Sequence, residues 1–193
     1  MTNDSSLFPP FSRWMEEAVL ENPLRRLIQS PLRVLKEMGV KLGDVLMDVG
    51  CGFGYLSIPA AELVAPTGLV YSVDVDEFKL RKLRERARSR NLSNLRTIRS
   101  EAWKIEEVDS CTVDVAVMFF SLHHFEKLRE SMEEAKTKLR RGGRLFVYDP
   151  IRTRFAGHGT SAEEVMKMGI DLGFSLRSLK KRGLTYSIEL MKS

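Results

Sequence analysis

The sequence of 193 residues is poor in cysteine and has no long apolar run. Its two cysteines, Cys51 and Cys111, stand far apart and form no metal-ligand pattern, so we predict no metal site and a reduced, cytoplasmic protein. No stretch is apolar enough to span a bilayer, and residues 1–10 lack the basic-then-apolar pattern of a signal peptide. Internal repeats and low-complexity segments are also missing, which favours one domain with a sizeable core.

The amino-terminal part of the chain differs from the rest. A helix is expected over residues 11–22, with Phe11, Trp14 and Met15 on or near one face, and a second helix over residues 30–39. We interpret residues 1–40 as a helical segment, either a lid over the site or a dimer contact, and residues 41–193 as the main domain. A monomer and a homodimer are both compatible with this division.

After residue 40, short apolar runs alternate with amphipathic segments. Strands are predicted at 45–49, 69–74, 95–99, 113–120 and 144–149, and helices at 55–65, 77–91, 125–143 and 161–173. Residues 174–179 and 184–191 flank "KKRG" as an antiparallel hairpin. The alternation predicts an α/β fold with a mostly parallel, Rossmann-like sheet and helices on both faces. Ligands of such sheets bind outside the carboxyl ends of the strands.

The stretch "DVGCGFG", residues 48–54, stands at the end of the first strand and before a helix. Its glycines are Gly50, Gly52 and Gly54, whereas a dinucleotide pyrophosphate requires the spacing Gly-x-Gly-x-x-Gly. A carboxylate at Asp48 would also face that diphosphate unfavourably, but it suits a cationic amine. S-adenosylmethionine carries an ammonium, a sulfonium and one carboxylate, so the residues favour it over a nicotinamide cofactor.

The order "VLMDVGCGFG … VYSVDVDE … SEAWKIEEV … DVAVMFFSLHHF … LRRGGRLFVYD" resembles the class I S-adenosylmethionine-dependent methyltransferases. Within them it is most similar to the branch that contains the ubiquinone and menaquinone biosynthesis methyltransferases. The resemblance covers residues 30–193 and implies a seven-stranded sheet with an antiparallel last strand.

The resemblance also implies roles for the residues that match the family's motifs. Asp48 would face the cofactor's ammonium, and Asp74 would bind the ribose hydroxyls, while Asp76 caps the next helix. Glu101 and Ala102 stand where the family usually has aspartate and alanine, and would contact the adenine. The remaining residues expected at the cofactor are Gly50, Cys51, Gly52, Gly54, Val75, Trp103 and Phe119. Trp103 could instead fill the core.

The stretch "FFSLHHF" follows the fourth predicted strand, where family members place residues beside the transferable methyl group. Phe119 and Phe120 would line this place, and His123 or His124 could act as a general base. Alternatively, one histidine caps the following helix and the other packs. Asp149, with Arg152, Arg154 and His158, could line an acceptor pocket or belong to an exposed basic loop.

We therefore expect a methyltransferase that converts S-adenosylmethionine to S-adenosylhomocysteine and modifies a small molecule. The stretch is not Asn/Asp-Pro-Pro-Tyr, which argues against methylation of exocyclic base amines or glutamine amides. An RNA or protein substrate remains an alternative, because "KLRKLRERARSR" could present a basic surface, although a solvated outer helix explains it as well. A non-catalytic partner protein that binds the cofactor is a further alternative.

Overall fold

The structure, a computed structural model, describes residues 30–151 and 159–193. Several sequence predictions lie outside these described residues: the helix over residues 11–22 with Phe11, Trp14 and Met15, and the candidate acceptor residues Arg152, Arg154 and His158.

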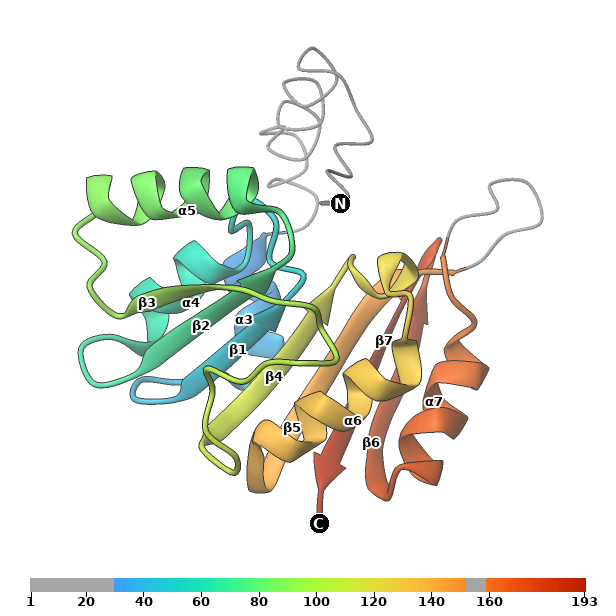
Figure 1. The fold of residues 1–193 in the computed structure, drawn as a ribbon. Coiled ribbons are helices and arrows are strands. Elements are labelled where there is room, and N and C mark those ends of the chain that lie inside the picture. The colour runs from blue at the N-terminus through green and yellow to red at the C-terminus, as the bar shows by residue number, and fades with distance from the viewer. Residues whose placement is uncertain (1–29, 152–158) are drawn as a thin grey trace.

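Seven strands form a single sheet (Figure 1). They are β1 (Val45–Val49), β2 (Leu69–Asp74), β3 (Leu95–Arg99), β4 (Val113–Phe119), β5 (Leu139–Pro150), β6 (Phe174–Arg182) and β7 (Thr185–Lys192). The order across the sheet is β3-β2-β1-β4-β5-β7-β6, with β7 antiparallel to both its neighbours and the other pairs parallel. The predicted fold is confirmed, and the strand order reverses between β1 and β4, where ligands of such sheets bind.

Helices cover both faces of this sheet. They are α3 (Pro31–Glu37), α4 (Ser57–Val64), α5 (Glu77–Ser89), α6 (Leu128–Lys138), α7 (Ala162–Asp171) and a short 3-10 helix, η1 (Leu122–His124). Figure 1 shows α6 and α7 in front of the sheet and α3 and α4 behind it. The Asp76 carboxylate accepts the Phe78 N–H at 2.8 Å, so this residue caps α5 as predicted. Ser161 likewise caps α7.

Alternation along β1 divides the core between the two faces. Met47 is fully buried in a cluster with Met132 of α6 and Val165 of α7. Its neighbour Leu46 is fully buried in a second cluster, which includes Leu35 of α3. Because both faces of β1 are covered, this strand reads as a continuous apolar run that is interrupted only by Asp48.

Most element boundaries differ from the sequence prediction by a few residues, and two of these differences have a clear physical meaning. The helix expected over residues 125–143 ends at Lys138, and Leu139 already belongs to β5, where it is fully buried and pairs with Val113. Burial of this leucine in the sheet overrides the helical pattern. The hairpin turn is also shorter than "KKRG", because β6 continues to Arg182 and leaves only residues 183 and 184 in the turn.

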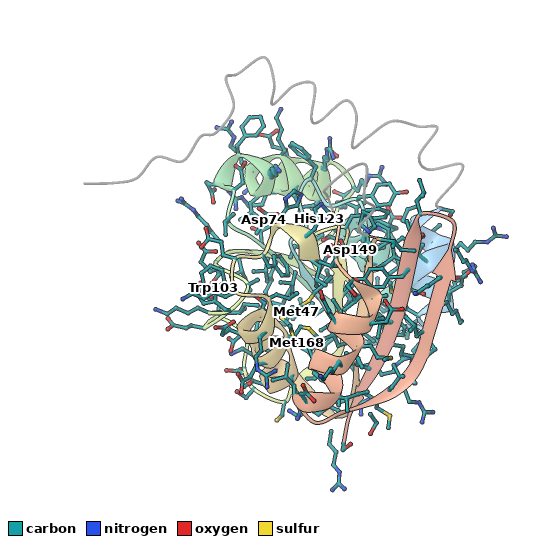
Figure 2. All side chains as sticks on the ribbon, turned by 90° about the vertical axis from the view of Figure 1, so that its right-hand side faces the viewer. Met47, Asp74, Trp103, His123, Asp149 and Met168 are labelled. Atoms are coloured by element: carbon teal, nitrogen blue, oxygen red, sulfur yellow. The ribbon has the colours of Figure 1, made fainter. Side chains whose placement is uncertain are left out.

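Replacement of a methionine side chain by alanine should cost most at the centre of the sheet. We expect Met47→Ala to lower the free energy of unfolding by about 2–5 kcal/mol, because it leaves a cavity between β1 and α6. Met168, which Figure 2 labels together with Met47, is only partly buried against the same cluster. Met168→Ala should cost about 1 kcal/mol or less. Urea denaturation measures both, and equal losses would contradict this account of the core.

Candidate cofactor and acceptor site

The glycine loop leaves β1 at the switch in strand order and is fixed by backbone hydrogen bonds. The N–H groups of Gly50 and Cys51 both donate to the carbonyl of Val73, at 2.8 and 3.0 Å. The N–H of Gly54 donates to the carbonyl of Cys51 at 2.9 Å. The Cys51 thiol is buried, and burial raises its pKa well above the ordinary value, which disfavours the reactive thiolate form.

The three glycines are required for different reasons. A Cβ atom at Gly50 would lie 2.4 Å from the Cβ of Ser121, and one at Gly54 would lie 2.3 Å from Cδ1 of Leu83. At Gly52, with a φ of +53°, a Cβ would meet nothing within 4 Å. Gly50 and Gly54 therefore allow close packing within the protein, whereas Gly52 leaves open space beside the backbone. Of the three, Gly52 is the glycine whose backbone a ligand can approach.

Asp48 carries a buried carboxyl group directly before this loop. Its Oδ2 accepts a hydrogen bond from the Ser57 hydroxyl at 2.6 Å. Burial raises the pKa of Asp48 to about 7; the Ser57 hydrogen bond opposes this increase, and the nearby charge of Asp74 adds to it. A cationic group placed beside Asp48 would relieve the cost of ionisation, whereas a diphosphate would increase it.

Asp74, at the end of β2, ties the loop to the neighbouring strand. Its Oδ2 accepts the N–H of Gly52 at 2.8 Å, and its Oδ1 accepts the N–H of Asp76 at 3.0 Å. Each carboxylate oxygen has a second lone pair for a ligand hydroxyl. The next residue, Val75, is 51% exposed, which makes it an apolar surface directly after the strand.

The segment that follows β3 carries the residues that we expect to contact the adenine. The N–H of Ser100 donates to the carbonyl of Asp74 at 3.2 Å, which holds this connection against β2. Glu101 is exposed and Ala102 is buried. Trp103 is half-buried. The ammonium of Lys127, directly before α6, lies over its ring, 5.0 Å from the ring centroid.

Aromatic rings surround the end of β4. Phe119 stacks against Tyr55 and Tyr148, with ring centroids 5.9 and 5.1 Å away, and lies edge-on to Phe120 at 5.0 Å. Phe120 has a φ of +52°, a backbone conformation that residues other than glycine rarely adopt. The backbone is therefore turned sharply between β4 and η1.

The two candidate histidines have different surroundings. Nδ1 of His123 lies 2.9 Å from Oδ1 of Asp149, and Asp149 is fully buried. His124 is exposed, and its ring centroid lies 4.1 Å from that of His123. Figure 2 labels Asp74, His123 and Asp149 at the same end of the molecule. The structure therefore joins two of the three predicted catalytic residues in one hydrogen-bonded pair.

Several residues that position this site were not among the predicted site residues. Ser57 binds Asp48, Ser121 packs against Gly50, and Thr160 and Tyr186 extend the contacts of Asp149. Tyr186 could have been noticed as a phenol on the apolar face of the last strand, since a buried phenol needs a polar partner. The other three give no signal of their own.

Other kinds of site receive no support from the part of the chain that the structure describes. No group of at least three His, Cys, Asp or Glu side chains could hold a metal ion there. None of the described helices is both long and apolar enough to cross a membrane. A groove of about 700 Å³ runs beside β3, but none of the residues that line it belongs to the predicted cofactor site.

Comparison with known proteins decides between cofactor families. A protein-family model described as a methyltransferase domain matches residues 41–182. The chain belongs to this methyltransferase family. The predicted resemblance is confirmed, and S-adenosylmethionine is the cofactor.

The similar proteins include two enzymes named for small-molecule acceptors. A probable cobalt-precorrin-6B C(15)-methyltransferase (decarboxylating) of Saccharolobus solfataricus is 30% identical over 80% of this chain and 73% of the relative. A demethylmenaquinone methyltransferase of Geobacillus sp. is 29% identical to the present chain, over 64% of the present chain and 52% of the relative. The chain therefore spans only about half the length of the latter.

A solved structure agrees over nearly the whole fold. The crystal structure of an S-adenosylmethionine-dependent methyltransferase from Aquifex aeolicus matches 93% of this methyltransferase and 98% of its own chain. The TM-score is 0.84 and the sequence identity is 26%.

Alanine substitutions at two glycines of the loop should distinguish an effect on cofactor binding from an effect on stability. We expect Gly52→Ala to cost about 1–2 kcal/mol of stability, from its positive φ alone, and to weaken S-adenosylmethionine binding because its methyl enters the open space. Gly54→Ala should lower stability more, by roughly 2–4 kcal/mol, since it also collides with Leu83. Denaturation and calorimetric titration measure the two effects. A Gly52→Ala protein with unchanged affinity would contradict the assignment.

Asp48 should make the stability of the ligand-free protein depend on pH. Because its pKa is raised in the folded state from 3.8 to about 7, the folded protein binds this proton more tightly than the unfolded chain. The resulting stabilisation is complete below about pH 4 and is lost as the pH rises through about 7. We expect wild type to lose stability relative to Asp48→Asn across this window, as measured by urea denaturation. A constant difference between the two proteins would refute the shift.

Proposed function

We propose that this methyltransferase acts on a small-molecule acceptor at the carboxyl ends of β1, β2 and β4. The observation that carries the cofactor site is the buried Asp48 carboxyl group beside the open backbone of Gly52. A small acceptor is supported by the names of the relatives, since a cobalt precorrin and demethylmenaquinone are both small molecules.

The residues of the loop and of β2 fit the chemical groups of the cofactor. Asp48 would pair with the ammonium, and Asp74 would accept the ribose hydroxyls on lone pairs that its two backbone contacts leave. Val75 would lie against the adenine, and the exposed Glu101 would accept from its amino group. The other residues that we place around the cofactor are Gly50, Cys51, Gly52, Gly54, Ala102, Trp103 and Phe119.

The residues at the carboxyl ends of β4 and β5 and in η1 would hold the acceptor. When bound, S-adenosylmethionine supplies an electrophilic methyl group and is left as S-adenosylhomocysteine. The chain's own contribution is to align the acceptor and exclude water, for which the aromatic rings of Phe119 and Phe120 are suited. His123, His124 and Asp149 are the candidate catalytic residues at this place.

An RNA or protein acceptor is the second candidate, and one observation favours it. The groove beside β3 is lined by Arg84, Arg88, Arg96 and Arg99, which is the kind of surface that binds phosphate groups. Arg84 is already engaged by Thr97 and Glu77, so the solvated surface remains the simpler account. A non-catalytic partner that only binds the cofactor is the third candidate.

Three further expectations accompany this proposal. We place the protein in the cytoplasm, treat it as a monomer or a homodimer, and divide the chain into a segment of residues 1–40 and a domain of residues 41–193.

A labelling experiment tests the proposed acceptor class. Purified protein is incubated with methyl-tritiated S-adenosylmethionine and an extract of the source cells, and the label is counted in the small-molecule and macromolecular fractions. We expect label in the small-molecule fraction. Label only in the macromolecular fraction would favour the second candidate, and no label despite cofactor binding would favour the third.

Two aspartate variants show whether the labelling depends on the proposed cofactor site. Asp74→Ala removes the ribose acceptor and the tie to Gly52, so it should abolish cofactor binding and labelling together. Asp171→Ala is the matched control, because this exposed aspartate ends α7. Calorimetric titration with NAD should give no binding to either protein or to wild type.

A further inference from the structure

One chain of hydrogen bonds joins four segments at the carboxyl end of β5. The Tyr186 hydroxyl contacts the Thr160 hydroxyl, which donates to Oδ2 of Asp149 at 2.9 Å. The other carboxylate oxygen, Oδ1, lies 2.9 Å from Nδ1 of His123. Both oxygens of the buried Asp149 therefore have a side-chain partner.

The sheet itself brings these residues together. Asp149 of β5 is paired directly with Tyr186 of β7, so their side chains project from the same face. The N–H of Thr160 donates to the carbonyl of Pro150 at 3.2 Å, which places its hydroxyl beside Asp149. Strand register therefore places Tyr186 beside Asp149, and a backbone hydrogen bond places Thr160 between them.

The direction of each hydrogen bond can be deduced. Burial raises the pKa of Tyr186 above its ordinary value, and the charge of Asp149 adds to this, so the phenol keeps its proton. A hydroxyl has only one hydrogen, and that of Thr160 is donated to Asp149. Tyr186 must then donate to Thr160. Asp149 accepts at both oxygens, so His123 donates from Nδ1.

This arrangement determines the tautomer of His123. When Nδ1 carries the hydrogen, Nε2 of a neutral imidazole carries a lone pair and can accept a proton. The His123 side chain is 14% exposed, whereas that of Asp149 is completely buried. The hydrogen-bonded chain thus runs from the interior to a ring that reaches the surface.

The turn that carries His123 is anchored to the cofactor loop. The Ser121 hydroxyl donates to the carbonyl of Val49 at 2.8 Å, directly before the glycines. The N–H of Phe120, the residue with positive φ, donates to the carbonyl of Tyr148 at 2.7 Å. Uncommon backbone conformations that are held in this way are frequent at functional sites.

We propose that His123 is the general base of the methyl transfer, that Asp149, Thr160 and Tyr186 are positioning residues, and that the acceptor carries a proton that it loses on methylation. This inference rests on the proposed function. The bond between the acceptor's nucleophilic atom and its hydrogen breaks, the proton goes to Nε2 of His123, and the electron pair left on that atom forms the bond to the methyl carbon. The carbon–sulfur bond breaks with its electron pair on sulfur, and the imidazolium returns its proton to water.

The tautomer can be measured without cofactor or acceptor. In ¹⁵N NMR spectra at a pH at which imidazoles are neutral, wild-type His123 should show a protonated Nδ1 and an unprotonated Nε2. In Asp149→Asn, the amide oxygen stays with the Thr160 donor, so the amide N–H faces Nδ1 and the tautomer should reverse. A wild-type His123 protonated at Nε2 would overturn the proposal.

Kinetics test whether the tautomer matters for catalysis. With tritiated cofactor and the small-molecule fraction, His123→Gln and Asp149→Asn should each lower single-turnover labelling by about 10²–10⁴-fold. Cofactor affinity should be unchanged in both. Equal losses in His123→Gln and His124→Gln, or labelling at the wild-type rate in His123→Gln, would overturn the role of His123.

Two substitutions at Thr160 test whether this residue positions Asp149 and His123. Thr160→Val should lower labelling by roughly tenfold and mix the two tautomers, whereas Thr160→Ser, which keeps the hydroxyl, should restore both. Loss of labelling in Thr160→Ser as well would overturn the positioning role. If wild type labels no small molecule, the proposed function fails. The tautomer measurement still shows whether His123 and Asp149 are hydrogen-bonded as described.

Discussion

The carboxylate of Asp74 is the contact on which the geometry of the cofactor site depends. It accepts one N–H from Gly52 and one from Asp76, so the same side chain fixes the glycine loop and the end of β2. A hydrogen bond to a charged acceptor is stronger than one between neutral groups. Because the loop is held from the neighbouring strand, the open space beside Gly52 lies next to the acid that is proposed to bind the ribose. One carboxylate therefore sets the shape of the loop and is also the group that we propose for ribose recognition.

Electrostatics explain why this loop suits a cationic ligand. Asp48 is buried and close enough to Asp74 for their charges to interact, and the side chain that lowers its pKa is the neutral hydroxyl of Ser57. Such a pair of carboxyl groups is unfavourable unless one is neutral or a cation lies beside them. The ammonium of S-adenosylmethionine meets this requirement, whereas the diphosphate of a dinucleotide does not. The charge of the site distinguishes these ligands more directly than the parallel part of the sheet, whose strand order 3-2-1-4-5 also occurs in dinucleotide-binding folds.

The parts of this structure that the sequence predicted are those governed by local patterns. The strands at 45–49, 69–74 and 95–99 agree with their short apolar runs, and Asp76 caps a helix as its position indicated. The error at Leu139 arose because burial between strands outweighed a helical pattern. Tyr186 could not be connected to Asp149 beforehand, since its position depends on the register of β5 and β7, which no local pattern specifies. Thr160 reaches Asp149 through a backbone hydrogen bond to Pro150, which no local pattern specifies either.

The two sides of the proposed acceptor site come from successive residues of one strand. Tyr148 and Asp149 project from opposite faces of β5, so Tyr148 joins the aromatic rings of β4 while Asp149 meets His123. A register shift of one residue would exchange the two faces and would bury a phenol where the carboxylate now lies. The seven paired residues between β5 and β7 prevent such a shift. The antiparallel strand at the end of the chain thus contributes to the site mainly by fixing which residue of β5 faces the histidine.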